Sequence, residues 1–322
     1  MEKVRLGIIG YGNMGTTHAD NILKGKCPDI ILTAIADIKE ARLSAAKEIF
    51  GDEVAYFDNA IAMLESGKID ACLVAVPHYD HTTLAMECMK RGIHVMVEKP
   101  AGVYTKQVEE MNAEAEKHPE VVFGMMFNQR TNCLYRKMRE LIKSGEYGQI
   151  RRTNWLITNW YRPQAYYDSG AWRATWSGEG GGVLINQGAH ILDMWQWLLG
   201  MPKKIYAQIP FGKYNDFAVD DEATVSMQYE NGMTGTIMLT TGEAVGQERF
   251  EIVGTKGRIL LEGNTLHIYR YSKDSQEYIA TEKVNSGENM RIEEEVINFD
   301  KEKNPYTKLK NLKTKIYFLN TA

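Results

Sequence analysis

The stretch LGIIGYGNMGTTHA, residues 6–19, combines a short apolar segment, a glycine-rich turn and the start of a helical pattern. Gly10, Gly12 and Gly15 have the spacing G-x-G-x-x-G, which is typical of dinucleotide-binding βαβ units. The first glycine allows a tight turn, the second lets the backbone approach a pyrophosphate, and the third lets the helix pack on the sheet. We therefore expect these glycines, with Asn13 and Met14 at the helix N-terminus, to bind the phosphates of a dinucleotide.

A carboxylate follows the second apolar segment, IILTAIAD, which ends at Asp37. A carboxylate at this position accepts hydrogen bonds from ribose hydroxyls and repels a 2′-phosphate, so the sequence favours NAD, with NADP the weaker alternative. Lys39 and Arg42 are close in sequence and weaken that preference. The alternative is a glycine turn that only packs the helix, with Asp37 serving as a helix cap.

Apolar segments alternate with helical patterns over the first 125 residues. This rhythm predicts a parallel sheet with helices on both faces. Beyond about residue 150, strands joined by tight turns such as Asn231–Gly232 predict an antiparallel sheet, interrupted by a helix over residues 186–199. We expect an α/β Rossmann domain over residues 1–125 and an α+β domain over residues 126–322.

Composition excludes several classes of partner. The 322 residues carry a net charge of −4, which gives no basic field for nucleic acid or anionic lipid. The apolar segments are too short to cross a bilayer, and the N-terminus lacks a signal-peptide layout. Cys27, Cys72, Cys88 and Cys133 show no metal or redox spacing. We therefore expect reduced thiols, no metal site, no membrane partner and a cytoplasmic protein.

The segment GIHVMVEKPAG, residues 92–102, carries Glu98, Lys99 and Pro100 directly from a buried strand into a turn. The carboxyl ends of parallel strands form the ligand-binding edge of such a sheet. A lysine there can donate to a substrate hydroxyl and to the nicotinamide ribose, so Lys99 is a candidate catalytic, substrate and cofactor residue, and Glu98 a candidate cofactor residue. The alternative is an exposed lysine after a strand.

Three further residues follow the preceding strand to the same edge. Pro77, His78 and His81 lie in VAVPHYDHTTLA, residues 74–85, and are candidate cofactor residues. For the two histidines the alternative is an ordinary position at the start of a helix.

The segment GGGVLINQGAHILDMWQWLLG, residues 180–200, places Asn186 and His190 four residues apart. On a helix they share one face, which makes both candidate catalytic and substrate residues. Histidine titrates near neutral pH and can accept a hydroxyl proton. Asp193 lies three residues further on, where it can orient the imidazole or pack at a domain boundary. The alternative for His190 is a structural histidine.

The segment NWYRPQAYYDSGAWRATWSGEGGG, residues 159–182, is rich in Trp, Tyr and Arg, which stack on sugar rings and bind hydroxyls. The candidate substrate residues in it are Trp160, Arg162, Tyr167, Trp172 and Arg173. The same residue types are enriched in subunit interfaces, which is the competing interpretation. Asn128, in FNQR at residues 127–130, either contacts substrate or bridges the domains.

Taken together, the glycine turn, the Glu-Lys-Pro turn and the Gly-Gly-Gly…His…Asp pattern resemble the Gfo/Idh/MocA family. The family is named after glucose–fructose oxidoreductase, inositol dehydrogenase and a rhizopine-catabolism protein. The resemblance implies NAD-dependent hydride transfer at a hydroxyl of a sugar, sugar derivative or cyclic polyol, with Lys99 catalytic and His190 the proton acceptor. Asn186 stands where many members carry aspartate.

The resemblance also implies homodimers or homotetramers formed through the sheet of the second domain. Members usually continue with helices that return toward the first domain, so this chain is either a short variant or lacks its final elements. Two other activities occur among relatives: glycoside cleavage through transient oxidation, and dinucleotide binding for regulation without catalysis. The presence of both Lys99 and His190 argues against the regulator.

Overall fold

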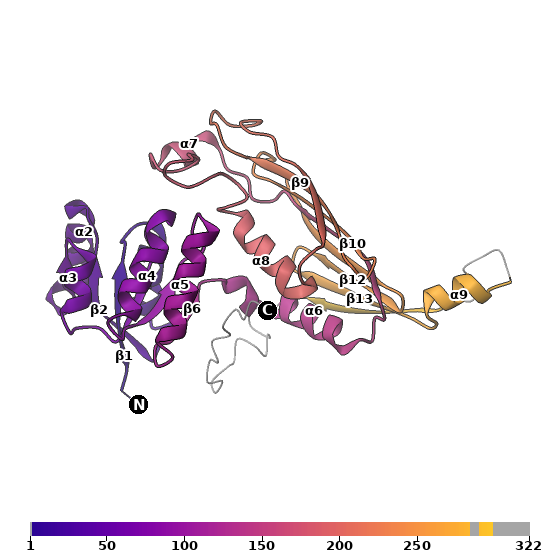
Figure 1. Cartoon of the computed structure of the whole chain (residues 1–322), viewed down its shortest axis with the longest axis horizontal. Helices are drawn as coiled ribbons and strands as arrows, with labels where there is room; N and C mark the ends of the chain where they lie inside the picture. The colour runs from indigo at the N-terminus through magenta and orange to yellow at the C-terminus, as the bar shows by residue number, and fades with distance from the viewer. Residues whose placement is uncertain (1, 284–289, 299–322) are drawn as a thin grey trace. The chain divides into compact units, whose positions relative to one another are not determined.

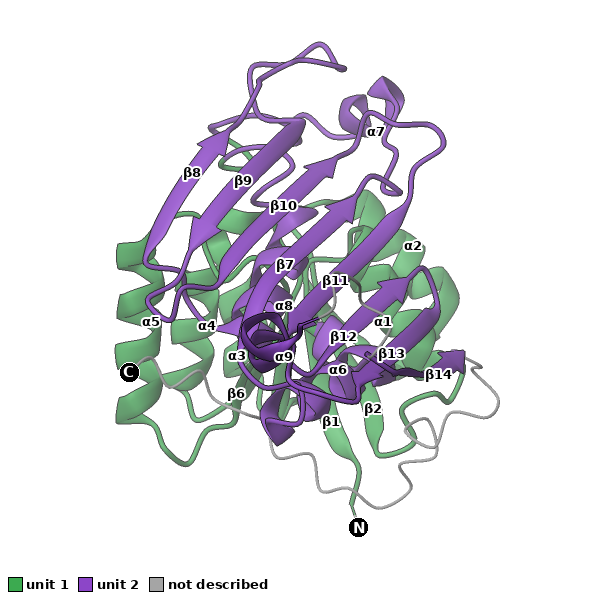
Figure 2. Ribbon diagram, turned by 90° about the vertical axis from the view of Figure 1, so that its right-hand side faces the viewer, with its two compact units in different colours: residues 1–127, 178–180, 313–322 green, residues 128–177, 181–312 purple. Residues whose placement is uncertain are grey.

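The computed structural model describes residues 2–283 and 290–298 (Figure 1). The described residues form two compact units, coloured separately in Figure 2. Unit 1 contains residues 2–127 and the short segment 178–180, and unit 2 contains the remaining described residues. The chain therefore passes from one unit to the other at residues 127–128, 177–178 and 180–181. The prediction about the final elements of the chain concerns residues 299–322, which lie outside the described residues.

Unit 1 contains a six-stranded sheet in the order β3-β2-β1-β4-β5-β6. Every neighbouring pair is parallel. The strands are β1 (Val4–Ile9), β2 (Ile30–Ala36), β3 (Ala55–Phe57), β4 (Ala71–Val74), β5 (His94–Val97) and β6 (Phe123–Met125). The order reverses direction at β1 and β4, whose carboxyl ends form the usual ligand site of such sheets.

Helices cover both faces of this sheet, and each face has its own apolar core. The helices are α1 (Asn13–Leu23), α2 (Glu40–Phe50), α3 (Ala60–Glu65), α4 (His81–Met89) and α5 (Thr105–Lys117). On one face Ala19 of α1 and Leu43 of α2 pack with Ile8 of the sheet. On the other face, Met63, Ala85 and Met111 come from α3, α4 and α5. Because these short strands are buried on both faces, their sequences do not alternate between apolar and polar residues.

Unit 2 contains an eight-stranded sheet in the order β14-β13-β12-β11-β7-β10-β9-β8. Its strands are β7 (Ile150–Ile157), β8 (Lys204–Gln208), β9 (Glu222–Gln228), β10 (Thr234–Thr240), β11 (Glu248–Gly254), β12 (Gly257–Glu262), β13 (Thr265–Tyr271) and β14 (Ile292–Asn298). Neighbours are antiparallel except β7 and β10, which are parallel. The long connection between β7 and β10, which includes a helix, permits this parallel pair and makes the sheet mixed.

The inner face of this sheet packs against α6 (Cys133–Ser144) and α8 (Gly188–Leu199). Trp155 of β7 and Phe250 of β11 stack with ring centroids 4.1 Å apart, and Met138 of α6 and Met194 of α8 belong to the same core. Alternate strand residues point to the other face, as the period of two in the burial of β9 shows. Figure 2 shows the sheet with α6 and α8 on its far side.

The described part of unit 2 also contains two smaller α-helices, α7 (Gln164–Asp168) and α9 (Ser275–Thr281). No helix in the described part of the chain has the length and apolar character needed to cross a membrane.

Candidate active site

The glycine turn has the geometry that its spacing predicts. Gly10 has φ +93°, and a Cβ there would lie 2.4 Å from the Ala75 carbonyl oxygen. A Cβ on Gly15 would lie 1.9 Å from the Gly10 carbonyl oxygen, so glycine is needed for α1 to approach the turn. Around Gly12 the nearest atoms belong to the Arg42 guanidinium, 3.7 Å away. The backbone of the turn therefore packs tightly at Gly10 and Gly15, whereas there is room beside Gly12.

No side chain of the described residues caps α1, whose N-cap residue is Gly12. The first turn of a helix has backbone N–H groups without partners inside the helix, and its dipole attracts anions. Asn13 and Met14 are exposed there. These features fit the pyrophosphate of a dinucleotide.

Asp37 is almost fully buried beside the glycine turn. Its Oδ2 accepts the Tyr11 N–H at 2.8 Å and pairs with Arg42 Nη1 at 3.1 Å, while Oδ1 accepts the Lys39 N–H at 2.8 Å. Helix α2 has Lys39 as its N-cap, so Asp37 is not the cap of that helix. An ionised carboxylate has about four lone-pair sites, so it keeps capacity for ribose hydroxyls.

Glu98 and His81 hold the turn that carries Lys99. Glu98 is buried, its Oε1 lies 2.7 Å from His18 Nε2, and its Oε2 accepts the Lys99 N–H at 3.2 Å. His81 is also buried, with Nδ1 2.7 Å from the Pro100 carbonyl oxygen and Nε2 2.9 Å from that of Val76. Lys99 itself is partly exposed. Its peptide bond to Pro100 is cis.

Two effects act in opposite directions on the pKa of His81. Burial lowers its pKa, although the carbonyl groups of Pro100 and Val76 both favour the protonated form. A neutral imidazole has one N–H, so it donates to one of these two carbonyls at a time. In either tautomer the ring is fixed between β4 and the turn after β5.

His78 lies in the turn after β4, in a short helix η2 (His78–Asp80) whose N-cap is Pro77. It is buried, and its Nδ1 lies 2.8 Å from the Glu179 carbonyl oxygen. Glu179 belongs to the segment 178–180 that is part of unit 1. A Cβ on Gly180 would lie 2.5 Å from a Val103 methyl group, so this segment packs closely within unit 1.

The prediction that Asn186 and His190 share a helix face is wrong, because α8 begins at Gly188. Asn186 is buried in the preceding turn, where its N–H donates to the Gly182 carbonyl at 3.2 Å. Asp220 organises this turn: its Oδ1 accepts the Gly182 N–H at 2.8 Å and its Oδ2 accepts the Leu184 N–H at 2.7 Å. These side-chain acceptors satisfy N–H groups of the turn that precedes α8.

A cavity of about 200 Å³ within unit 2 brings His190 and Trp160 together. Tyr135 of α6 and Glu248 of β11 line it as well, and the Tyr135 hydroxyl donates to Glu248 Oε1 at 2.7 Å. Burial, reinforced by the Glu248 carboxylate, raises the pKa of Tyr135 well above its ordinary value. Tyr135 and Glu248 were not predicted, because 113 residues separate them and no short motif marks either one.

Most of the aromatic segment is placed elsewhere. Tyr167 is buried, its hydroxyl lies 2.9 Å from Thr241 Oγ1, and its ring packs against Phe217. The Arg173 guanidinium lies over the rings of Tyr166 and Trp172, at 4.5 and 4.7 Å. The described lining of the His190 cavity does not include Arg162, Tyr167, Trp172 or Arg173.

The structure also places Asn128 and Asp193. Asn128 is exposed at the start of a short helix η3 (Asn128–Thr131), next to Gln129, which lines the cavity. Asp193 forms a bidentate pair with Arg130, at 2.9 and 2.5 Å, and packs inside unit 2.

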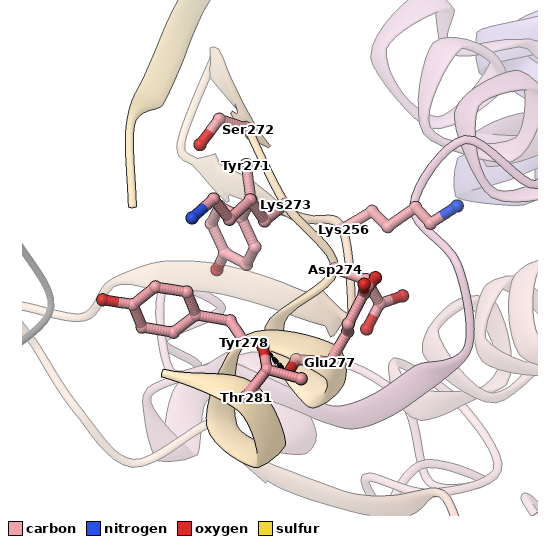
Figure 3. Close-up of a pocket in the computed structure, with 8 residues that line it drawn as sticks. All are labelled: Lys256, Tyr271, Ser272, Lys273, Asp274, Glu277, Tyr278 and Thr281. Carbon is pink, nitrogen blue, oxygen red and sulfur yellow. Dashed lines mark hydrogen bonds between the residues drawn. The ribbon is translucent and has the colours of Figure 1, made fainter. Parts of the chain in front are cut away.

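A larger cavity of about 690 Å³ lies between the end of β13 and α9 (Figure 3). Its lining is polar and includes Lys273, Asp274 and Tyr278, but none of the predicted site residues. Within residues 2–283 and 290–298, no group of three or more His, Cys, Asp or Glu side chains is arranged to hold a metal ion.

Comparison with known proteins identifies the family. Residues 4–125 match the oxidoreductase family with an NAD-binding Rossmann fold, and residues 135–260 match the GFO/IDH/MocA C-terminal domain. The chain belongs to the GFO/IDH/MocA family. This membership confirms the predicted fold class, the assignment as an oxidoreductase and NAD as the cofactor.

Relatives of this family member include named dehydrogenases. A myo-inositol 2-dehydrogenase of Thermotoga maritima is 29% identical over 267 residues, which cover 80% of this chain and 75% of the relative. A D-glucoside 3-dehydrogenase of Escherichia coli is 29% identical over 263 residues, covering 75% and 71%. The solved structure of the WlbA dehydrogenase from Bordetella pertussis, in complex with NADH and UDP-GlcNAcA, is 26% identical. It superimposes with a TM-score of 0.75 over 81% of this chain and 79% of that one.

Proposed function

We propose that this oxidoreductase transfers a hydride between NAD and a hydroxyl group of a sugar, sugar derivative or cyclic polyol. The observation that carries the proposal is the cavity in unit 2, which is lined by both His190 and Trp160. Unit 1 of the same chain contains the glycine turn formed by Gly10, Gly12 and Gly15. An imidazole for the proton and an aromatic face for the ring are the groups that alcohol oxidation of a sugar needs. The relatives named as inositol and glucoside dehydrogenases support the same class of substrate.

In the proposed site, the residues of unit 1 hold the dinucleotide. The glycine turn and the N–H groups of Asn13 and Met14 bind the pyrophosphate, and Asp37 binds the adenosine ribose. Pro77, His78, His81, Glu98 and Lys99 shape the edge of the sheet on which the cofactor lies. NAD, when bound, supplies the hydride acceptor.

In the proposed mechanism, two side chains take part in proton transfer from the substrate hydroxyl. His190 accepts the hydroxyl proton as the C–H bond is broken, and Lys99 positions the same hydroxyl and shares the proton transfer. Glu98 and His81 keep Lys99 at the sheet edge through the contacts described above. Most of the rate enhancement would come from fixed geometry between the alcohol carbon and the cofactor.

The remaining predicted residues serve the substrate in this proposal. Asn186 orients the ring from the turn before α8, and Asn128 contacts it from η3. Trp160 stacks on the ring. Arg162, Tyr167, Trp172 and Arg173 form an aromatic and cationic cluster around Tyr166, which would act as a rim.

In the same proposal, residues 1–125 form the NAD-binding domain and residues 126–322 form the domain for substrate binding and self-association. Homodimers or homotetramers would form through the outward face of the eight-stranded sheet. The exposed Tyr206 on the edge strand β8, which pairs with the outward-facing Ser226 of β9, supports such a surface. Light scattering on a size-exclusion column measures the mass, and a monomer at all concentrations would remove this part of the proposal.

The test of the activity is NADH formation with a panel of sugars and inositols. Lys99→Ala and His190→Ala should each abolish turnover and retain NAD binding, measured by calorimetry. Lys117→Ala, which changes an exposed lysine in the same unit, serves as the control. Turnover retained in either site variant contradicts the assignment. Product release without net NADH indicates the glycoside-cleaving alternative, and NAD binding without turnover of any sugar indicates the regulator.

A further inference from the structure

The cavity that contains His190 has an uneven distribution of charge. Among the described residues that line it, Glu248 is the carboxylate, and no lysine or arginine contributes. Amide side chains of Gln129, Asn132 and Asn264 supply further polar atoms, while Trp160 supplies an aromatic surface. A ligand in this cavity therefore meets hydrogen-bonding groups and one negative charge.

Glu248 is oriented toward the inner face of the sheet. Along β11, Phe250 and Ile252 belong to the apolar core on the α6 and α8 side. Glu248 is two residues before Phe250 on the same strand, so its side chain points to the same face of the sheet. The Tyr135 hydroxyl from α6 donates to its Oε1, which fixes the carboxylate in place. Glu248 forms no ion pair with a cation within the described residues.

Such a carboxylate has unused acceptor capacity. One hydrogen bond from Tyr135 occupies one of about four lone-pair sites on the carboxylate. A half-buried carboxylate that has no cation beside it among the described residues is stabilised by a ligand that donates to it, and it repels a second anion across a short distance.

The size of the cavity limits the ligand. At about 200 Å³ it is below the roughly 300–1,000 Å³ of pockets that bind drug-sized ligands. It suits one six-membered ring and not a ring joined to a nucleotide within the same space.

We propose that this cavity is the binding site for a single polyhydroxylated ring and that Glu248 determines the charge of its substituent. The site accepts a ring that presents hydroxyl or ammonium groups to Glu248 and rejects a ring with a carboxylate or phosphate there. The proposal rests on the proposed function, because it names the substrate class for the same site. Glu248 acts here as a specificity-determining residue that touches the substrate, and Tyr135 is a positioning residue that acts through it.

The experiment compares three six-membered rings of similar size and different charge, glucosamine, glucose and glucuronate, with the full chain in the presence of NAD or NADH. The wild-type protein should discriminate against glucuronate, both in kcat/KM and in the Kd measured by calorimetry with NADH bound. Glu248→Gln keeps the shape and the acceptor for Tyr135 but removes the charge. It should reduce the glucosamine-to-glucuronate preference by about ten- to a hundredfold, the range for a hydrogen bond to a charged group.

Two further variants make the result specific. Glu262→Gln removes an exposed carboxylate on the neighbouring strand β12, on the other face of the sheet, and should leave the preference unchanged. Tyr135→Phe removes the donor that fixes Glu248 and should reduce the preference while Glu248 stays charged. The melting temperature of each variant separates a change in specificity from a loss of folding.

Three results would overturn the proposal: a wild-type preference for glucuronate, an equal preference in wild type and Glu248→Gln, or no difference in binding among the three rings. If none of the sugars and inositols yields NADH, the proposed function fails, and the calorimetric series still decides the charge preference of the cavity. If NADH forms but the preference does not depend on Glu248, the proposed function stands and this inference fails.

Discussion

Glu98 Oε1 lies 2.7 Å from His18 Nε2, so a residue of the Glu-Lys-Pro turn is bonded to the helix that begins at the glycine turn. The second carboxylate oxygen accepts the Lys99 N–H. One buried side chain thereby links the helix proposed to bind phosphate with the lysine proposed to bind the alcohol. Cofactor and lysine positions are coupled through Glu98 in this arrangement.

Replacing Glu98 with alanine should leave Lys99 mobile and reduce kcat more than it changes KM for NAD. The loss of hydrogen bonds at a buried site should also lower the free energy of unfolding by about 1–3 kcal/mol. Steady-state kinetics and urea denaturation measure the two effects. Glu120→Ala, at an exposed position of the same unit, is the control. An unchanged kcat in Glu98→Ala would show that the turn keeps its position without this carboxylate.

His81→Asn should change how stability depends on pH. Burial holds the pKa of His81 below its ordinary value of 6.5, so below pH 6.5 the unfolded chain takes up a proton that the folded chain does not. This group therefore lowers the free energy of unfolding as pH falls from 6.5 toward the folded pKa. Asparagine does not titrate, so the variant should show a flatter stability profile below pH 6.5.

Denaturant titrations at a series of pH values measure that profile. An identical slope in the wild type and in His81→Asn would mean that His81 is protonated as readily in the folded chain as in the unfolded one. The same variant should lower kcat, because asparagine is too short to contact both the Val76 and the Pro100 carbonyl groups.

Asp37→Ser should shift the preference between the two dinucleotides. The substitution removes the charge that repels a 2′-phosphate and leaves Arg42 close to Gly12, where it can pair with that phosphate. The ratio of kcat/KM for NADP to that for NAD should rise about tenfold or more, which corresponds to about 1.4 kcal/mol. Arg42→Ala in the Asp37→Ser background should cancel the gain. A ratio that stays at the wild-type value would place the ribose away from Asp37.

Asp220→Ala should disturb the turn before α8. It removes the acceptors of the Gly182 and Leu184 N–H groups, and a buried donor without a partner costs about 1–3 kcal/mol. We expect a lower melting temperature together with a raised KM for the sugar, because Asn186 lies in this turn. Asp216→Ala, four residues earlier and exposed, provides the matched control. Equal melting temperatures for the two variants would show that the turn does not depend on Asp220.

The parallel sheet and its glycine turn were predictable because they depend on local signals. Gly10 needs a positive φ, and the buried strands appear as uninterrupted apolar segments such as residues 71–74. The start of α8 was not predictable from local propensity, because the turn before it is held by Asp220, which is 38 residues from Gly182 in sequence and accepts the Gly182 N–H. Contacts at that separation leave no periodic trace in the sequence.

The candidate site shows the same division. Lys99 and His190 stand in recognisable motifs, whereas Tyr135 and Glu248 come together only because α6 packs on the inner face of β11. In the aromatic segment, Tyr167 is buried against Phe217, a contact 50 residues away in sequence that residue type alone does not predict. The pairing of β7 with β10 likewise depends on a long connection and not on either strand alone.

The segment 178–180 makes unit 1 discontinuous in sequence. A gene fragment that stops at residue 127 would encode all six of its strands but would omit the Glu179 carbonyl group that faces His78. Transfer of this unit to another protein by a single crossover at residue 127 would leave the same gap, and a graft would also have to supply the segment 178–180.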